Sequence, residues 1–191
     1  HFLFNALSSI YFRFQETKDP KGKDLVQDLK WMIQYAIEKC QKYQFVTLED
    51  ELNFAKTYLK FHNYLPGKIT LPNLGPADKT YLLMPMLLNP LMENVIKHGN
   101  LNQEKGFLTL KLEIQETNLL LTLENSYQDL PFQHISPLTK GFGIGLENLR
   151  KRLSQFYQTS SLYHLYVSKN QENQTFKTEL LLPIMTQEPI E

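Results

Sequence analysis

The sequence predicts an α+β fold, in which an N-terminal helical hairpin precedes an α/β sandwich whose helices cover one face of a mixed sheet. Two observations lead to this prediction. In the N-terminal part, apolar residues recur every three or four positions, as in amphipathic helices. Further along, apolar and polar residues alternate in segments such as FLTLKLEIQ, as in strands with one buried face. The 191 residues are 42% hydrophobic, which is enough for a substantial core.

The first two helices are expected within residues 1–18 and 24–40, where apolar residues follow helical spacing. Pro20 and Gly22 lie between them and are expected to end the first helix. The apolar stripe of the second helix is wide, so a hairpin of two such helices leaves apolar surface uncovered. We therefore expect a homodimer, in which two hairpins form a four-helix bundle.

The remaining elements follow in order along the chain. Residues 47–65 are expected to form a third helix, with Thr47 and Asp50 resembling a capping box. Strands are expected at 68–74, 107–115, 119–125, 162–168 and 175–183, a helix at 83–99, and a glycine-rich turn leading into a helix at 141–157. The composition changes near the third helix, so we divide the chain into a helical domain, 1–45, and an α/β domain, 46–191.

The overall charge argues against a partner that is bound through charge alone. Lysine plus arginine and aspartate plus glutamate both number 20, so the formal net charge is zero at pH 7. Nucleic acids and anionic membranes attract proteins with an excess of positive charge. We therefore expect no direct contact with nucleic acid. The single cysteine, Cys40, is expected to be a reduced thiol.

The glycine-rich turn GFGIGL is a candidate phosphate site. Gly141, Gly143 and Gly145 come directly before a predicted helix and leave backbone N–H groups open at its positive end, and Leu146 completes the motif. Lys140 precedes the motif and adds a positive charge. The alternative interpretation is a tight turn between a strand and a helix, without a ligand.

Polar residues near the end of the helix predicted at 83–99 form a second candidate site. Glu93, Asn94, Lys97 and His98 project from one side of this helix. An asparagine oxygen is a suitable ligand for Mg²⁺, and a lysine beside it neutralises phosphate charge. The alternative interpretation is an ordinary helix end with solvated polar residues.

Three segments, HFLFNAL, LLNPLMENVIKHG and GFGIGLENLRKRL, occur in an order that resembles the LytS/YehU-type sensor histidine kinases. In that family the HFLFN histidine box precedes an ATP-binding domain of the GHKL, or Bergerat, fold. By this resemblance His1 accepts the γ-phosphoryl group of ATP, Asn94 binds Mg²⁺, and the three glycines hold the phosphates. Asn5 lies one helical turn from His1 and either orients its ring or is a surface amide.

The resemblance also implies the cellular role. The chain is expected to autophosphorylate with ATP and Mg²⁺ and to pass the phosphoryl group to an aspartate of a response regulator, which in these systems often carries a LytTR-type DNA-binding domain. Membrane-spanning helices are expected upstream, which would make this part the cytoplasmic portion of a membrane protein.

The sequence departs from the family at Asn125, where these proteins usually have an aspartate that accepts a hydrogen bond from the adenine amino group. The alternation of strand 119–125 places Asn125 on the buried side, and its amide can accept this bond without a charge. The departure leaves open a non-catalytic dimeric docking module with a degenerate nucleotide site. An ATP hydrolase is disfavoured, because Pro90 stands where related ATPases have the glutamate that activates water.

Overall fold

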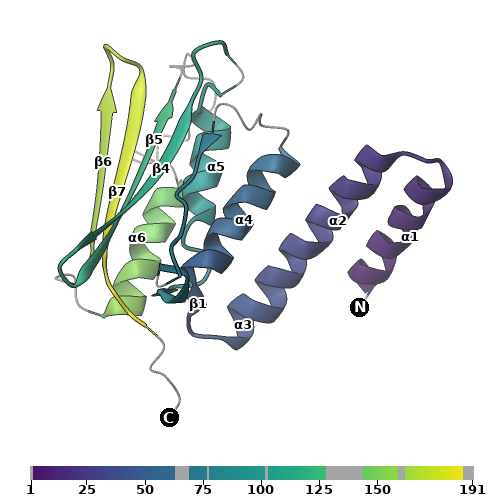
Figure 1. Ribbon diagram of the computed structural model, residues 1–191, viewed down its shortest axis with the longest axis horizontal. Coiled ribbons are helices and arrows are strands. Elements are labelled where there is room, and N and C mark those ends of the chain that lie inside the picture. The colour runs from purple at the N-terminus through teal and green to yellow at the C-terminus, as the bar shows by residue number, and fades with distance from the viewer. Residues whose placement is uncertain are drawn as a thin grey trace.

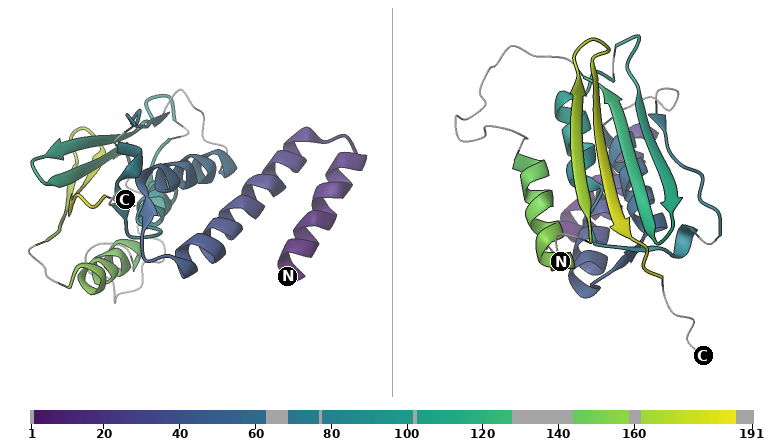
Figure 2. Two further views of the ribbon diagram at one scale, coloured as in Figure 1. Left: turned by 60° about the horizontal axis from the view of Figure 1, so that its bottom comes forward. Right: turned by 90° about the vertical axis from the view of Figure 1, so that its left-hand side faces the viewer.

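The computed structural model describes residues 2–62, 69–76, 78–101, 103–127, 144–158 and 162–186. A helical hairpin stands beside an α/β sandwich (Figure 1). Helices α4, α5 and α6 cover one face of a five-stranded mixed sheet, and among the described residues no helix covers the other face (Figure 2). This architecture confirms the predicted α+β class. None of the described helices is both long and apolar enough to cross a membrane.

The hairpin consists of α1 (Phe2–Glu16) and α2 (Pro20–Gln34). The predicted break between the two helices is present at residues 17–19, but Pro20 and Gly22 lie after it, in the first turn of α2. Proline fits the first helical position, where its missing N–H is not needed. The Asp19 side chain caps the helix by accepting hydrogen bonds from the backbone N–H groups of Lys21 and Gly22, both at 3.1 Å.

The hairpin continues into a π-helix, Tyr35–Lys39, and a short α3, Cys40–Lys42. Strand β1 (Val46–Thr47) then pairs antiparallel with β3 (Leu82–Leu83), and the sequence analysis predicted neither strand. Helix α4 runs from Leu48 to Phe61 and ends earlier than expected. Its predicted cap is confirmed, because the Asp50 N–H donates to the Thr47 hydroxyl oxygen at 3.1 Å.

The main sheet has the order β2 (Ile69–Thr70), β4 (Leu108–Gln115), β5 (Asn118–Ser126), β7 (Thr175–Pro183) and β6 (His164–Asn170). Strand β2 is parallel to β4, and the other pairs are antiparallel. The alternation predicted for β5 is confirmed, since Leu119, Leu121 and Leu123 are buried. These leucines face the helices and form the main core with them.

Helix α5 (Asn89–His98) packs between α4 and the last helix, α6 (Ile144–Tyr157). A 3₁₀ turn, Asp78–Thr80, precedes them. The predicted helix 83–99 begins only at Asn89, because Leu82 and Leu83 belong to β3 and Met86 has a φ of 56°. A residue whose backbone is in the left-handed region cannot continue a right-handed helix.

A second, smaller core joins the hairpin to the sandwich. It is formed by Met32, Tyr35, Val46 and Phe54, which come from the hairpin, β1 and α4. The division at residues 45 and 46 stays a prediction, and this core shows that the two parts share apolar contacts.

The hairpin and the π-helix that follows it expose several apolar residues. Leu3, Ile10, Phe12, Leu25 and Ile37 are each at least 42% exposed. Such a surface suits the predicted four-helix bundle, which stays a prediction.

The main core should be sensitive to cavities on α6. Leu149 is fully buried there, so Leu149→Ala should lower the free energy of unfolding by about 2–5 kcal/mol. Gln155 lies on the exposed side of the same helix, and Gln155→Ala should change it by less than about 0.5 kcal/mol. Urea unfolding followed by circular dichroism measures both, and equal effects would contradict this assignment of the core.

Candidate functional site

The end of α5 is attached to the end of β5. The Gly99 N–H closes the helix by donating to the Val95 carbonyl oxygen at 2.7 Å. Gly99 also forms an isolated bridge with Tyr127, and the Asn100 N–H donates to the Ser126 carbonyl oxygen at 3.0 Å. These contacts hold the polar end of α5 beside the last residues of β5.

Asn125 lies beneath this junction, with 1% of its surface exposed. Its buried position confirms the prediction from strand alternation. The side-chain nitrogen donates to the Ser126 carbonyl oxygen at 2.8 Å, while the side-chain oxygen has no hydrogen-bond partner among the described residues. A buried acceptor without a partner is costly, so this oxygen is suited to an N–H donor brought by a ligand.

Gly99 explains how the helix end comes so close to Asn125. A Cβ atom at Gly99 would lie 3.4 Å from the Asn125 side-chain nitrogen and would overlap the Val95 carbonyl oxygen. A larger residue would therefore clash with the last turn of α5 and disturb the helix end that lies beside β5. The sequence analysis did not select Gly99, although its place directly after His98 marks a helix end.

Thr178 is a second buried polar residue that the sequence analysis missed. It is 1% exposed, and its hydroxyl has no hydrogen-bond partner among the described residues. On β7 it pairs with Leu123, while Asn125 pairs with Phe176, so Asn125 and Thr178 are diagonal neighbours on the inner face. The only signal in the sequence is its alternation in phase with Leu180 and Leu182.

The polar side of α5 is partly ordered by contacts within the helix. Glu93 accepts a hydrogen bond from the Asn89 side chain at 3.1 Å and pairs with Lys97 at 3.3 Å. Asn94 is half-buried. Partial burial, together with the charges of Lys97 and Lys169, lowers the pKa of His98 below its ordinary value of 6.5. The His98 ring is therefore neutral at pH 7 and adds no positive charge.

The start of α6 lies beside the start of α5. A Cβ atom at Gly145 would lie 3.9 Å from the Pro90 carbonyl oxygen. Asn94 follows Pro90 by one helical turn and therefore shares its face of α5. The Leu146 side chain is buried in the main core, so Leu146 can meet a ligand only through its backbone. Lys140, Gly141 and Gly143 fall outside the described residues.

The N-terminal site is separated from α5 within one chain. His1 falls outside the described residues, and Asn5 is exposed on α1. Helices α2 and α4 lie between α1 and α5 in Figures 1 and 2. The structure therefore does not bring Asn5 and the polar face of α5 together.

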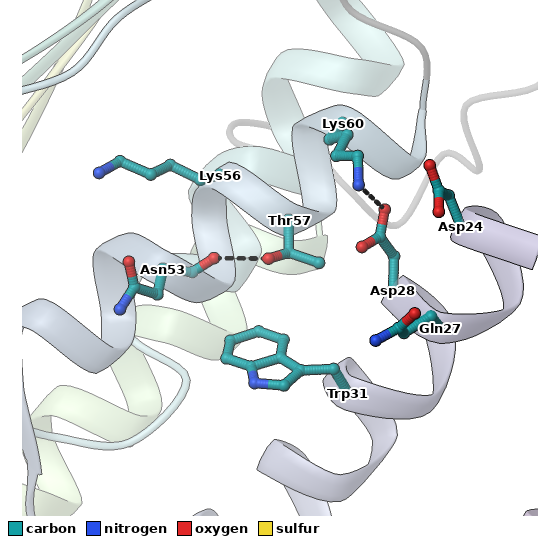
Figure 3. Close-up of a pocket in the computed structure, with 8 residues that line it drawn as sticks. All are labelled: Asp24, Gln27, Asp28, Trp31, Asn53, Lys56, Thr57 and Lys60. Carbon is teal, nitrogen blue, oxygen red and sulfur yellow. Dashed lines mark hydrogen bonds and ion pairs between the residues drawn. The ribbon is translucent and has the colours of Figure 1, made fainter. Parts of the chain in front are cut away.

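A cavity of about 600 Å³ lies elsewhere, between α2 and α4 (Figure 3). It is lined by Asp24, Gln27, Asp28, Trp31, Asn53, Lys56, Thr57 and Lys60. The Lys60 ammonium spans it to reach the Asp28 carboxylate at 2.8 Å. This cavity lies between the hairpin and the sandwich, and none of the predicted site residues lines it.

Comparisons with known proteins agree with this picture. Residues 1–68 match the family described as Histidine kinase. The chain is 27% identical over 182 residues to the sensor protein kinase HptS of Staphylococcus aureus (strain USA300), an alignment that covers 90% of this chain and 34% of HptS. It matches the HptS proteins of strains NCTC 8325 / PS 47 and COL equally well. The chain thus spans about a third of the length of these relatives.

Two solved structures of the catalytic domain of histidine kinase ThkA, both nucleotide-free, share the fold. One has a TM-score of 0.51 at 14% identity and covers 76% of this chain and 99% of that domain. The other has a TM-score of 0.50 at 14% identity and covers 74% and 95%. The sandwich therefore has the fold of a histidine kinase catalytic domain, and the sequence matches support a sensor histidine kinase.

Proposed function

We propose that the chain is the kinase core of a two-component sensor, which autophosphorylates His1 with ATP and Mg²⁺ and then transfers the phosphoryl group to a response-regulator aspartate. The observation that carries this proposal is the buried Asn125 side-chain oxygen at the junction of α5 and β5, an acceptor that no described residue pairs with. It lies in a fold shared with histidine kinase catalytic domains.

Two groups on the inner face of the sheet, neither with a hydrogen-bond partner in the described part of the chain, fit an adenine ring. The Asn125 oxygen would accept a hydrogen bond from the adenine amino group, and the Thr178 hydroxyl would bond to a ring nitrogen, directly or through water. Both groups are buried, so a bond to either is not exchanged for a bond to bulk water. The fit is to a planar base with a donor and an acceptor on one edge.

The neighbouring helix starts fit the phosphates. Gly145 lies in the first turn of α6, close to Pro90 in the first turn of α5. Asn94 lies on the same face of α5 as Pro90. Gly141, Gly143 and Lys140 would extend this surface, and Lys97 would add charge if it leaves Glu93. The Asn94 amide oxygen would hold Mg²⁺, which neutralises charge on the phosphates.

The reaction needs positioning more than activation. A neutral His1 imidazole attacks the γ-phosphorus, a P–N bond forms, the P–O bond to the leaving ADP breaks, and the ring proton passes to solvent. Because α2 and α4 separate α1 from α5, the hairpin must approach the nucleotide by a rearrangement within the chain or from the second chain of a homodimer. Asn5 would orient the imidazole.

The wider assembly follows from the same proposal. The chain would be the cytoplasmic portion of a membrane sensor, and its partner would be a response regulator. Regulators with a LytTR-type DNA-binding domain are one candidate class. The alternative is a non-catalytic dimeric docking module, which the uncharged Asn125 favours. Hydrolysis is less suited, because Pro90 leaves no carboxylate at that position of α5.

The direct test is phosphorylation of a chain extended upstream of His1, using γ-labelled ATP and Mg²⁺. We expect a label that is labile in acid and stable in base, that is absent in His1→Gln, and that is lost together with Mg·ATP binding in Asn94→Ala. Absence of label in a protein that binds ATP would favour the docking module.

Asn125→Asp should tighten Mg·ATP binding several-fold, because a charge-assisted bond to the adenine amino group is stronger by about 1 kcal/mol. The aspartate also loses the bond to Ser126, but it does so with and without nucleotide, so this loss affects stability rather than affinity. Isothermal titration calorimetry measures the change. Unchanged or weaker affinity would remove Asn125 from the adenine.

Thr178→Val should weaken Mg·ATP binding about three- to tenfold, while the melting temperature stays the same or rises. The two side chains have the same shape, and the valine removes a hydroxyl that has no described partner. Calorimetry and thermal unfolding together test this. A lower melting temperature with unchanged affinity would show that the hydroxyl is structural.

A further inference from the structure

Glu51 of α4 is an acidic residue in the interior of the protein. None of its surface is exposed. Its Oε1 accepts hydrogen bonds from the Tyr35 hydroxyl and the Met86 N–H, both at 2.7 Å, and its Oε2 accepts one from the Leu88 N–H at 2.9 Å. One carboxylate thus contacts the π-helix at the end of α2 and the turn that leads into α5.

Glu51 provides the cap that α5 lacks. Leu88 occupies the position before the first residue of this helix, and no side chain of the helix itself caps it. A carboxylate that accepts N–H groups at a helix start is favoured by the helix dipole. Burial raises the pKa of Glu51, and the hydrogen bonds from Leu88, Tyr35 and Met86 oppose this effect.

The turn before α5 is held in a strained conformation from two sides. Met86 has a φ of 56°, which a residue with a side chain adopts only when its surroundings impose it. Its N–H is held by Glu51. Its carbonyl oxygen accepts a hydrogen bond from Arg152 of α6 at 3.0 Å, and Arg152 also donates to the Pro85 carbonyl oxygen.

The Tyr35–Glu51 hydrogen bond lies where the α-helix α2 gives way to the π-helix. Tyr35 is the first residue of the π-helix, and one residue corresponds to about 100° of rotation around a helix. A change from π to α winding would therefore turn the Tyr35 hydroxyl away from Glu51. From Tyr35, α2 runs along α4 towards the cavity that the Lys60–Asp28 ion pair spans. The two helices therefore pack against each other at the end near Tyr35.

We propose that Glu51 is a positioning residue, which links the hairpin, through Tyr35, to the start of the nucleotide-binding helix α5. The inference rests on the proposed function, because it assigns the Asn94 helix to nucleotide and the hairpin to the phosphorylated histidine. A purely structural role is less suited to this site, because apolar side chains of similar volume would fill it without burying an ionisable group.

Tyr35→Phe tests the link, because it removes only the hydroxyl on the hairpin side and leaves both N–H bonds of Glu51 to the turn. In the chain extended upstream, we expect kcat for autophosphorylation to fall about fivefold or more, and KM for ATP to stay within about twofold. Tyr157→Phe is the matched control, because Tyr157 is also buried and its hydroxyl has no described partner. It should behave as the unmodified chain.

Hydrogen exchange, measured without nucleotide, tests the link independently of catalysis. The Met86 and Leu88 amides should exchange several times faster in Tyr35→Phe than in Tyr157→Phe, and faster still in Glu51→Gln, whose NH₂ group cannot accept a bond. Unchanged exchange at both amides in Tyr35→Phe would overturn the proposal, as would an unchanged kcat or an equal loss of ATP binding and kcat. A failure of the proposed function differs from these results, since the unmodified chain would then acquire no label.

Discussion

Strict side-chain alternation along β5 determines where the polar atoms of the candidate site lie. Leu119, Leu121 and Leu123 must all face the helices to complete the main core, and Asn125 is the next residue in phase. A strand cannot turn one residue outwards without shifting its register, which would move Leu119, Leu121 and Leu123 to the other face of the sheet. The core therefore forces an amide into the interior, and the Ser126 carbonyl satisfies only its nitrogen.

Helix α5 is held at both ends by groups from other elements. At its end, Gly99 and Asn100 are bonded to the last residues of β5, and at its start the Glu51 carboxylate replaces a local cap. A binding site is accurate when the element that carries it is fixed by its surroundings. Helix α5 meets this condition through polar contacts in addition to its buried apolar face.

The sequence predicted the elements whose patterns are long and local. The alternation of β4, β5 and β7 and the periodicity of α4 and α6 led to the correct types of element, and Asn125 was correctly placed inside. Short strands such as β1 carry too few residues for a pattern, and the late start of α5 depends on the conformation of Met86. Proline and glycine also suggested a break where Asp19 in fact starts a helix.

The contacts of the site are harder to predict, because they join distant residues. Glu51 meets its three partners at separations of 16, 35 and 37 residues, and in the sequence it resembles any polar residue on a helix. Thr178 resembles any inward residue of a strand. What distinguishes both is burial and hydrogen bonding, which exist only once the elements are assembled.

The strand order has a consequence for how the protein reaches its native state. Strands β4 and β5 form one local hairpin and β6 and β7 another, whereas β5 and β7 pair residues as distant as Asn118 and Pro183. Closing such a long loop is slower than forming local hairpins. Asn125 and Thr178 become neighbours only in the β5–β7 pairing, so a partly folded chain with both hairpins formed would still lack the candidate site. A ligand that binds there would stabilise only the completed sheet.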